Sequence, residues 1–273
     1  MSDKAVPEAK YADIGDGLRV HYHEQGEGMP VVFLHGSGPG ASGYSNFKLN
    51  FPYFAEHGYR AIVPDTLGFG YSSKPDVDYD LEFLVAALKR FTDSLGVTDC
   101  AVVGNSMGGA MSIMFALANP DQVKKLVLMA PGGLEETEVY MKMQGIRTML
   151  KVWFKEGVNR DTMRKVFALQ LFDGDQVTEQ TITERLEIAN LQPKRVLSSL
   201  KVPYLSERIK ELSCPVFGLW GVNDQFCPVS GAKTLIENID NCRVLTLSKC
   251  GHWVMVEHTD LFNRLCIDFL TNG

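Results

Sequence analysis

The sequence predicts an α/β fold in which a mostly parallel central sheet carries helices on both faces and an inserted helical cap. Short apolar runs, typical of buried parallel strands, alternate with stretches of helical periodicity. Gly-rich turns follow several of these runs, at the end of the strand where α/β sheets bind their ligands. One long segment, residues 133–205, is helix-prone without a convincing strand, so we expect it to form the cap.

Composition narrows the class of protein. The chain has 273 residues, 45% of them hydrophobic, which suffices for a large domain with a substantial core. Its net charge of −6 and its scattered Lys and Arg predict no nucleic-acid partner. Residues 1–10 match neither a secretory nor a transit signal, and no apolar run is long enough to span a membrane. We therefore expect a cytoplasmic protein that acts on a small molecule, and we leave open a homodimer or higher homo-oligomer.

Cysteine and histidine spacing gives no sign of a metal site. The six cysteines form no C-x-x-C pair, and we expect reduced thiols that pack as small apolar side chains. His21 and His23 share one face of an expected strand, but no third ligand lies nearby. A pair of solvated surface histidines is the better interpretation, and no metal or other cofactor is implied.

The first half of the chain alternates strands and helices. An opening hairpin is expected over residues 12–26, with residues 20–23 in its second strand. Strands are then expected at 31–34, 59–65, 100–104 and 123–129, and helices at 45–57, 81–95 and 107–118. This order predicts parallel strands joined by right-handed crossovers.

The alternation resumes after the cap. A strand is expected at 215–221, a helix at 230–238, the last strand at 244–247 and an amphipathic terminal helix at 257–270. We therefore divide the chain into a core domain of residues 1–132 and 206–273 and a cap domain of residues 133–205. The clearest cap helices are expected at 140–154 and 178–190.

A serine between glycines occupies the turn after the expected strand 100–104. Residues 102–109 read Val-Val-Gly-Asn-Ser-Met-Gly-Gly, an apolar run followed by Gly-x-Ser-x-Gly. In a nucleophile elbow, Gly104 and Gly108 let the strand and helix backbones approach while Ser106 projects its hydroxyl. Because such a pattern also occurs by chance in loops, the chain must also supply a base, an acid and an oxyanion hole.

A carboxylate and a histidine follow the last two expected strands. His252 comes after the last strand and is the best candidate for the general base, and Asp224 follows the penultimate strand and can orient the imidazole. Asp65 also ends a strand. If the acid lay one strand earlier, Glu135 or Glu136 would have to serve.

Ser106, Asp224 and His252 occur in the chain order of α/β-hydrolases. The Gly-rich turn at residues 35–41 is the expected place of the oxyanion hole, and His35 is expected to order this turn. A serine at position 106 argues against dehalogenase-type and epoxide-hydrolase-type chemistry, which would place an aspartate there. The residues alone therefore predict hydrolysis through an activated Ser–His pair.

Three motifs resemble those of the meta-cleavage product hydrolases, carbon–carbon bond hydrolases of bacterial aromatic degradation. They are His-Gly-Ser-Gly-Pro-Gly-Ala at 35–41 with Ser-Asn at 45–46, Gly-Asn-Ser-Met-Gly-Gly at 104–109, and Ser-Lys-Cys-Gly-His-Trp at 248–253. The resemblance covers nearly the whole chain and is weakest in the cap.

The resemblance implies site residues position by position. The backbone N–H groups of Ser37 and Met107 would form the oxyanion hole, although many family members carry Gly in place of Ser37. Positions that match the family's substrate-binding residues are Gly36, Gly38, Asn46, Asn105, Arg185, Phe226 and Trp253. Phe226 matches an apolar pocket wall, and the planar fork of Arg185 suits a carboxylate.

Some of these residues also have a purely structural interpretation. Arg185 lies beside Glu184 and Glu187, with which it could form a surface ion pair. Asn46 could be a turn residue and Trp253 a core aromatic.

The implied reaction is cleavage of a 2-hydroxy-6-oxohexa-2,4-dienoate with some 6-substituent. A proton shift would give a ketone, and attack at the C6 carbonyl would then expel a dienolate, with Ser106 either forming an acyl-enzyme or activating water. The alternative is a carboxylesterase that acts on small or medium acyl esters with the same triad. Arg185 and Asn46 discriminate between the two, because an ester site needs no subsite for a carboxylate.

Overall fold

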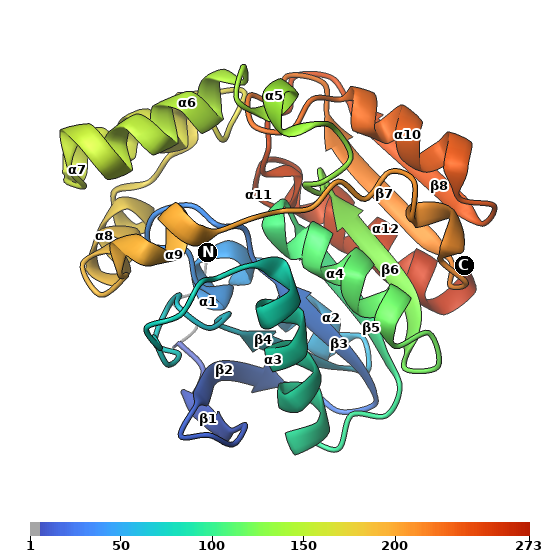
Figure 1. Ribbon diagram of the computed structural model, residues 1–273. Coiled ribbons are helices and arrows are strands. Elements are labelled where there is room, and N and C mark those ends of the chain that lie inside the picture. The colour runs from blue at the N-terminus through green and yellow to red at the C-terminus, as the bar shows by residue number, and fades with distance from the viewer. Residues whose placement is uncertain (1–5) are drawn as a thin grey trace.

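An eight-stranded sheet forms the centre of the molecule (Figure 1). The structure is a computed structural model that describes residues 6–273, so the first five residues of the expected core domain lie outside it. The strands are β1 (Lys10–Asp13), β2 (Arg19–Gln25), β3 (Met29–Leu34), β4 (Tyr59–Pro64), β5 (Cys100–Asn105), β6 (Val123–Met129), β7 (Val216–Gly221) and β8 (Cys242–Leu247). Their order is β1-β2-β4-β3-β5-β6-β7-β8, and every pair from β4 to β8 is parallel. The predicted mostly parallel sheet is confirmed.

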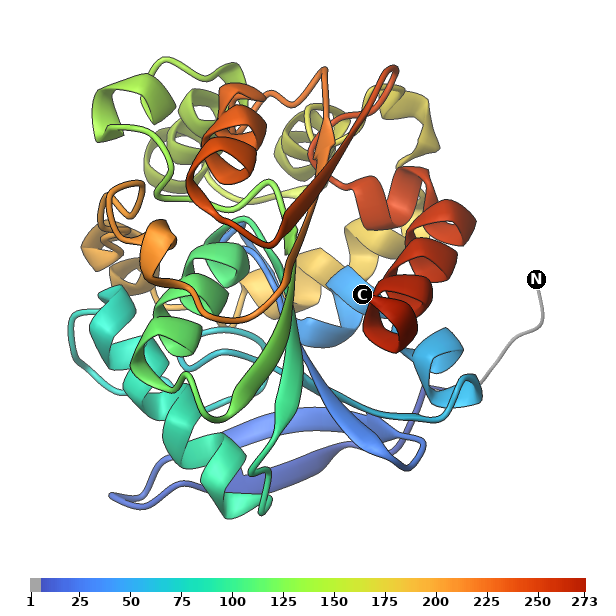
Figure 2. The same cartoon turned by 90° about the vertical axis from the view of Figure 1, so that its right-hand side faces the viewer.

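Helices cover both faces of this sheet (Figures 1 and 2). One face packs against α3 (Leu81–Ser94), α4 (Met107–Ala118) and α10 (Ser230–Asn238). The other face packs against α1 (Gly43–Phe47), α2 (Phe51–Glu56), α11 (Val254–Glu257) and α12 (Thr259–Asn272). Only β1 and β2 run antiparallel to their neighbours, at the edge that the predicted opening hairpin forms.

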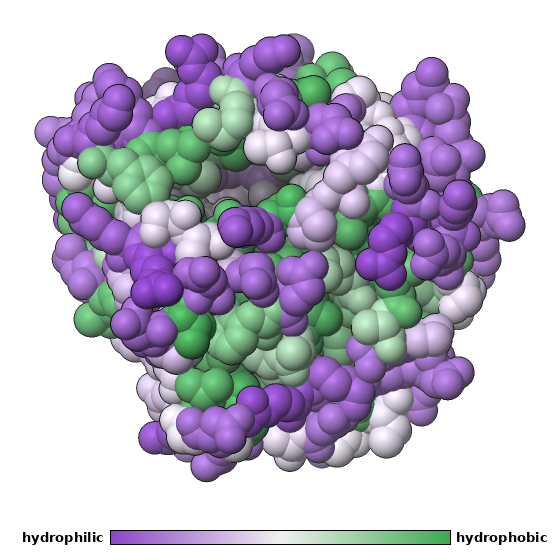
Figure 3. All heavy atoms as spheres, viewed as in Figure 1, coloured by the Kyte–Doolittle hydropathy of each residue, from purple (hydrophilic) through white to green (hydrophobic). Residues whose placement is uncertain are grey.

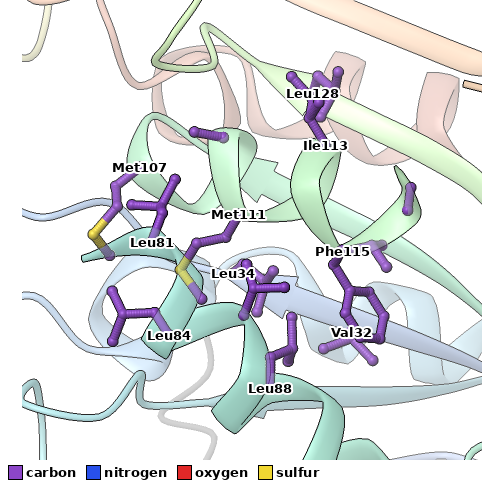
Figure 4. Packing of buried hydrophobic residues seen from close by; sticks show 14 of the residues in the cluster. Val32, Leu34, Leu81, Leu84, Leu88, Met107, Met111, Ile113, Phe115 and Leu128 are labelled. Carbon is purple, nitrogen blue, oxygen red and sulfur yellow. The ribbon is translucent and has the colours of Figure 1, made fainter. Parts of the chain in front are cut away.

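Strand β3 shows why its sequence is apolar throughout. Val32 and Leu34 belong to the core on one face of the sheet, and Val31 and Phe33 belong to the core on the other. Figure 4 shows Val32 and Leu34 beside Phe115 and other side chains of α3 and α4. Because a strand alternates its side chains between two covered faces, all positions must be apolar, and each large side chain contributes about 1.5–3 kcal/mol by burial.

One predicted helix is divided in the structure. The expected helix 45–57 becomes α1 and α2, and Asn50 precedes the second of them. Its buried side-chain amide donates to the Met255 carbonyl at 2.9 Å, while Pro52 stands in the first turn of α2. Proline is tolerated in a first turn but not in a helix interior, so the chain restarts there. The terminal helix expected at 257–270 corresponds to α12, and the short α11 precedes it.

Helices fill the segment expected to form the cap, which lies over the ends of the parallel strands (Figure 1). They are α5 (Thr137–Tyr140), α6 (Gln144–Lys151), the π-helix η1 (Val152–Glu156), α7 (Arg160–Ala168), the short η2 (Gly174–Gln176), α8 (Glu179–Ala189) and α9 (Lys194–Ser199), and the short η3 (Ile209–Glu211) follows before β7. The two helices singled out from the sequence correspond to α6 with η1 and to α8. Within the described residues, no strand interrupts the stretch from β6 to β7.

The cap contacts the turns at the strand ends through its backbone as well as its side chains. The hydrogen bonds that join them run from Gly145 N–H to Gln225 O (2.8 Å), from His252 N–H to Gln170 O (2.7 Å) and from Gly40 N–H to the Gln192 side-chain oxygen (3.0 Å). These three turns include those that carry the predicted acid and base, so the cap takes part in holding them in place.

The expected surface position of His21 and His23 is wrong. Their exposed fractions are 3% and 5%, and the His21 ring lies 2.7 Å from a carboxylate oxygen of Asp65. The rings of Tyr11 and Tyr71 pack beside the His21 ring, each with its centroid 5.2 Å away, and shield it from solvent. Asp65 also accepts a hydrogen bond from Gly43 N–H at 2.7 Å and is therefore engaged away from His252.

Two further expectations concern cysteines and membranes. All six cysteines are free thiols, and all are buried except Cys242, which is partly exposed. In the described part of the chain, no helix combines the length and apolarity that crossing a bilayer requires.

Candidate active site

Ser106 sits in a strained turn between β5 and α4. Its backbone has φ 58° and ψ −118°, a conformation that non-glycine residues rarely adopt. A Cβ atom on Gly104 would come within 2.4 Å of Gly108 O, and one on Gly108 would come within 2.1 Å of Leu34 O. Both glycines are therefore required by close backbone contacts, which is the geometry of a nucleophile elbow.

Asp224 and His252 form a buried pair beside this turn. His252 Nδ1 lies 2.6 Å from Asp224 Oδ2, and the two residues are 2% and 7% exposed. The other carboxylate oxygen accepts hydrogen bonds from Phe226 N–H at 2.7 Å and from Cys227 N–H at 2.9 Å. With Oδ1 held by two amides, Oδ2 faces the imidazole and fixes the tautomer that leaves Nε2 free to accept a proton.

Packing as well as hydrogen bonding holds the catalytic residues in place. The Phe226 ring stacks on the His252 ring, with centroids 5.1 Å apart and planes inclined by 27°. Ser106 and His252 line the same cavity, and the buried thiol of Cys227 lies close to the serine. Catalytic hydrogen bonds of this kind often tighten only when substrate is bound.

The expected oxyanion donors flank the serine. Met107 is the first residue of α4, so its N–H has no acceptor inside the helix, while its side chain packs in the apolar core (Figure 4). Ser37 lies in the turn after β3 and lines the cavity with Gly36 and Gly38. A Cβ on Gly36 would lie only 3.3 Å from Ser106 Cβ, so the turn passes close to the nucleophile.

His35 orders this turn, as expected. Its Nδ1–H donates to Gly36 O at 2.7 Å, and its Nε2 accepts from Thr66 N–H at 3.0 Å. Burial lowers the pKa of His35 to about 4, so the ring is neutral and can act as donor and acceptor at once.

Arg185 and Asn46 meet inside the molecule, not at the surface. The Arg185 guanidinium donates to Asn46 Oδ1 at 2.7 Å, and the two residues are 2% and 3% exposed. The guanidinium carbon lies 5.0 Å from the Trp253 ring centroid and 5.4 Å from that of Phe167. Burial lowers the pKa of Arg185 to about 9, which leaves a positive charge at neutral pH. Glu184, the suspected surface partner, instead pairs with Lys48 at 2.6 Å.

One small cavity brings these residues together. It has a volume of about 30 Å³ and is lined by Gly36, Ser37, Gly38, Asn46, Asn105, Ser106, Ile146, Met149, Gln170, Arg185, Phe226, His252 and Trp253. Figure 3 shows a hollow in this face of the molecule, with hydrophobic residues on one side of its rim and hydrophilic or intermediate residues on the rest. A volume of this size holds about one water molecule, so a larger ligand must displace cap side chains.

Three lining residues were not predicted as site residues. Ile146 and Met149 lie on the face of α6 that is turned to the core, and Gln170 follows α7. The apolar spacing of α6 was the available signal for Ile146 and Met149, but it fits a packed core equally well. Gln170 carried no sequence signal. Among the predicted residues, Met107 and Asp224 do not line the cavity, which suits a backbone donor and a carboxylate that lies behind His252.

Comparison with known proteins agrees with this geometry. Residues 29–171 match the model of the alpha/beta hydrolase fold family. The chain is 36% identical over 266 residues to a 2-hydroxy-6-oxo-6-phenylhexa-2,4-dienoate hydrolase of Burkholderia cepacia, covering 94% of this chain and 92% of that one. The chain belongs to the meta-cleavage product hydrolases of the α/β-hydrolase family.

Other members of this family are similar to the same extent. A 2-hydroxy-6-oxononadienedioate/2-hydroxy-6-oxononatrienedioate hydrolase of Comamonas testosteroni is also 36% identical, with 94% of this chain and 92% of that one covered. Among solved structures, a meta-cleavage product hydrolase from Pseudomonas fluorescens IP01, crystallised as a mutant with acetates, superposes with a TM-score of 0.85. The two sequences are 30% identical, and the match covers 96% of this chain and 97% of that one. This meta-cleavage product hydrolase is therefore a serine hydrolase with a Ser-His-Asp triad.

Proposed function

We propose that this enzyme cleaves a carbon–carbon bond in a 2-hydroxy-6-oxohexa-2,4-dienoate-type ring-fission product of aromatic degradation. The observation that carries the proposal is a buried cation in the same cavity as the serine. Arg185 is 2% exposed, and none of the described carboxylates forms an ion pair with it. A substrate carboxylate supplies the missing counter-charge, whereas a simple acyl ester has none to offer.

The residues around Ser106 fit the two stages of this reaction. First, the proton of the 2-hydroxyl is lost and C5 gains one, which gives a ketone at C2. The serine oxygen, or a water that it activates, then attacks C6 while His252 takes the proton. The N–H groups of Ser37 and Met107 stabilise the oxygen anion that forms.

The second stage breaks the bond between C5 and C6. The bond's electron pair moves onto C5 and into the C2 ketone as a dienolate, which His252 protonates. The 6-substituent leaves with C6 as a carboxylic acid, after water has supplied the second oxygen. The conjugated ketone is what makes a carbon leaving group feasible, and Arg185 holds it in place through the neighbouring carboxylate.

The apolar wall of the cavity is the part that would contact the 6-substituent. Ile146, Met149 and Phe226 are apolar, and among the lining residues Arg185 is the only Lys or Arg. A second carboxylate, as in a nonadienedioate, would meet no cation there. The lining therefore favours an uncharged 6-substituent, which the flexible side chain of Met149 can accommodate by changing rotamer.

The decisive experiment offers two substrate classes side by side. We expect purified protein to bleach the coloured 6-phenyl dienoate with a much higher kcat/KM than it shows for p-nitrophenyl acetate. Ser106→Ala should abolish both activities. Turnover of the ester while the dienoate keeps its colour would support the carboxylesterase alternative and overturn the proposal.

We also propose that the enzyme acts in the cytoplasm. This location is consistent with the six free thiols, because a reducing compartment keeps unpaired cysteines reduced.

A further inference from the structure

Three polar side-chain atoms in the lining of the catalytic cavity are buried without a hydrogen-bond partner. They are Asn105 Oδ1, Gln170 Oε1 and Arg185 Nε. Buried polar groups are nearly always paired in folded proteins, since an unpaired group has lost its water without compensation. Their shared position in one cavity indicates that a ligand completes their hydrogen bonds.

Gln170 is the member of this set that no motif accounts for. Its side chain is 5% exposed, and its backbone is fixed on two sides. Its carbonyl oxygen accepts hydrogen bonds from His252 N–H at 2.7 Å and from Trp253 N–H at 3.2 Å, and its own N–H donates to Phe167 O at 2.9 Å. The backbone contacts account for the residue's position but leave the side-chain amide without a role.

The neighbours of Gln170 place it at the end of the cavity that holds Arg185. Phe167 and Trp253, both bonded to the Gln170 backbone, are the two rings that flank the guanidinium, at 5.4 Å and 5.0 Å. The apolar wall of Ile146 and Met149 comes from α6, a different part of the cap. The amide therefore belongs with the polar subsite.

The chemistry of the unpaired atoms defines the ligand group that fits. Arg185 Nε is a donor and requires an acceptor, whereas the carbonyl oxygen of the Gln170 side chain requires a donor. A carboxylate with a hydroxyl on the adjacent carbon offers both. A carboxylate alone satisfies Arg185 and leaves the amide oxygen unpaired.

We propose that Gln170 is a specificity-determining residue whose side-chain carbonyl accepts a hydrogen bond from the 2-hydroxyl of the dienoate while Arg185 holds its carboxylate. This inference rests on the proposed function and adds to it the recognition of the 2-hydroxy acid. The enzyme selects substrates that carry the hydroxyl because dienoates without it leave Gln170 unsatisfied.

The test compares two ligands on matched proteins. In a Ser106→Ala background, binding of 2-hydroxy-6-oxo-6-phenylhexa-2,4-dienoate and of its analogue lacking the 2-hydroxyl is measured by titration, with and without Gln170→Met. Methionine keeps the length of the side chain and every backbone contact. We expect the substitution to weaken binding of the hydroxy ligand about ten-fold, the effect of one hydrogen bond, and to change binding of the analogue less than two-fold.

Gln180→Met is the matched control, because Gln180 is an exposed cap glutamine outside the cavity lining. It should leave both affinities unchanged. The melting temperature of Gln170→Met in the Ser106→Ala background should match that of Ser106→Ala alone, which shows that the fold is preserved.

This design distinguishes failure of the role of Gln170 from failure of the proposed function. Equal weakening of both ligands by Gln170→Met, or no weakening of either, would overturn the role of Gln170 even if the wild-type enzyme cleaves the dienoate. Failure of the wild type to cleave any dienoate would overturn the proposed function itself.

Discussion

Replacing Arg185 with methionine should separate the two substrate classes. The variant keeps the length of the side chain and removes the only Lys or Arg charge in the cavity lining. Two charge-assisted hydrogen bonds to a substrate carboxylate, at about 1.5–3 kcal/mol each, correspond to a loss of about 10²- to 10⁴-fold in kcat/KM for a dienoate. Hydrolysis of p-nitrophenyl acetate, which has no carboxylate, should change less than about three-fold.

The fold should tolerate this substitution because opposing contributions nearly cancel. Burial lowers the pKa of Arg185 to about 9, which corresponds to a penalty of about 5 kcal/mol on the charged form. Against this, the variant loses the hydrogen bond to Asn46, about 1–3 kcal/mol, and two cation–π contacts of about 1 kcal/mol each. The melting temperature should therefore stay the same or rise slightly.

The assay records the bleaching of the 6-phenyl dienoate and the release of p-nitrophenol for wild type, Arg185→Met and Arg164→Met. Arg164 is a cap arginine whose side chain is 46% exposed, and it pairs with Glu179. It controls for a general loss of positive charge from the cap. An equal loss of both activities in Arg185→Met, or an undiminished rate with the dienoate, would refute the reasoning.

Four further predictions test other parts of the site. Asp224→Asn should lower kcat about 10⁴-fold for both substrate classes, because an amide stabilises the wrong imidazole tautomer; a loss below ten-fold in steady-state kinetics would contradict this role. Ser37→Gly should leave kcat within about three-fold, because the proposed donor is a backbone N–H, and a loss near 10²-fold would instead assign the role to the hydroxyl. Met149→Ala should raise kcat/KM for dienoates with bulky 6-substituents relative to kcat/KM for the 6-methyl dienoate. An unchanged ratio of these two values would show that Met149 does not contact the 6-substituent. Burial lowers the pKa of His35 to about 4, whereas in the unfolded chain this residue takes up its proton near pH 6.5. The free energy of unfolding should therefore fall by about 3 kcal/mol as the pH drops from 6.5 to 4. Urea titrations should show a shallower fall for His35→Gln, and parallel curves for the two proteins would argue against this linkage.

The parts predicted correctly are those that local sequence determines. Gly104 is required by its contact with Gly108, within a few residues of Ser106, so the elbow is visible in the sequence, whereas Gly108 is required by the more distant Leu34. Strand β3 is apolar because both faces are covered, which a short window of residues also reveals. The pairing of Asp224 with His252 follows because both come after parallel strands whose ends meet at one edge of the sheet.

The parts that were missed depend on packing between distant segments. Gln170 enters the site only because its backbone docks on the turn of His252, more than eighty residues later in the chain. His21 is buried because Asp65 and Tyr71, more than forty residues later in the chain, pack against it, and the alternation of a hairpin does not show these contacts. The break before α2 is different, because Pro52 marks it in the sequence.

The central claim is that Ser106 drives hydrolysis of a carbon–carbon bond, and product stoichiometry tests it most directly. The 6-phenyl dienoate is incubated with wild-type protein, and benzoate and the five-carbon hydroxydienoate are quantified by liquid chromatography as the colour fades. The account predicts one molecule of each product for every dienoate consumed, and neither product with Ser106→Ala. Loss of colour without benzoate, or benzoate release by the Ser106→Ala variant at the wild-type rate, would contradict it.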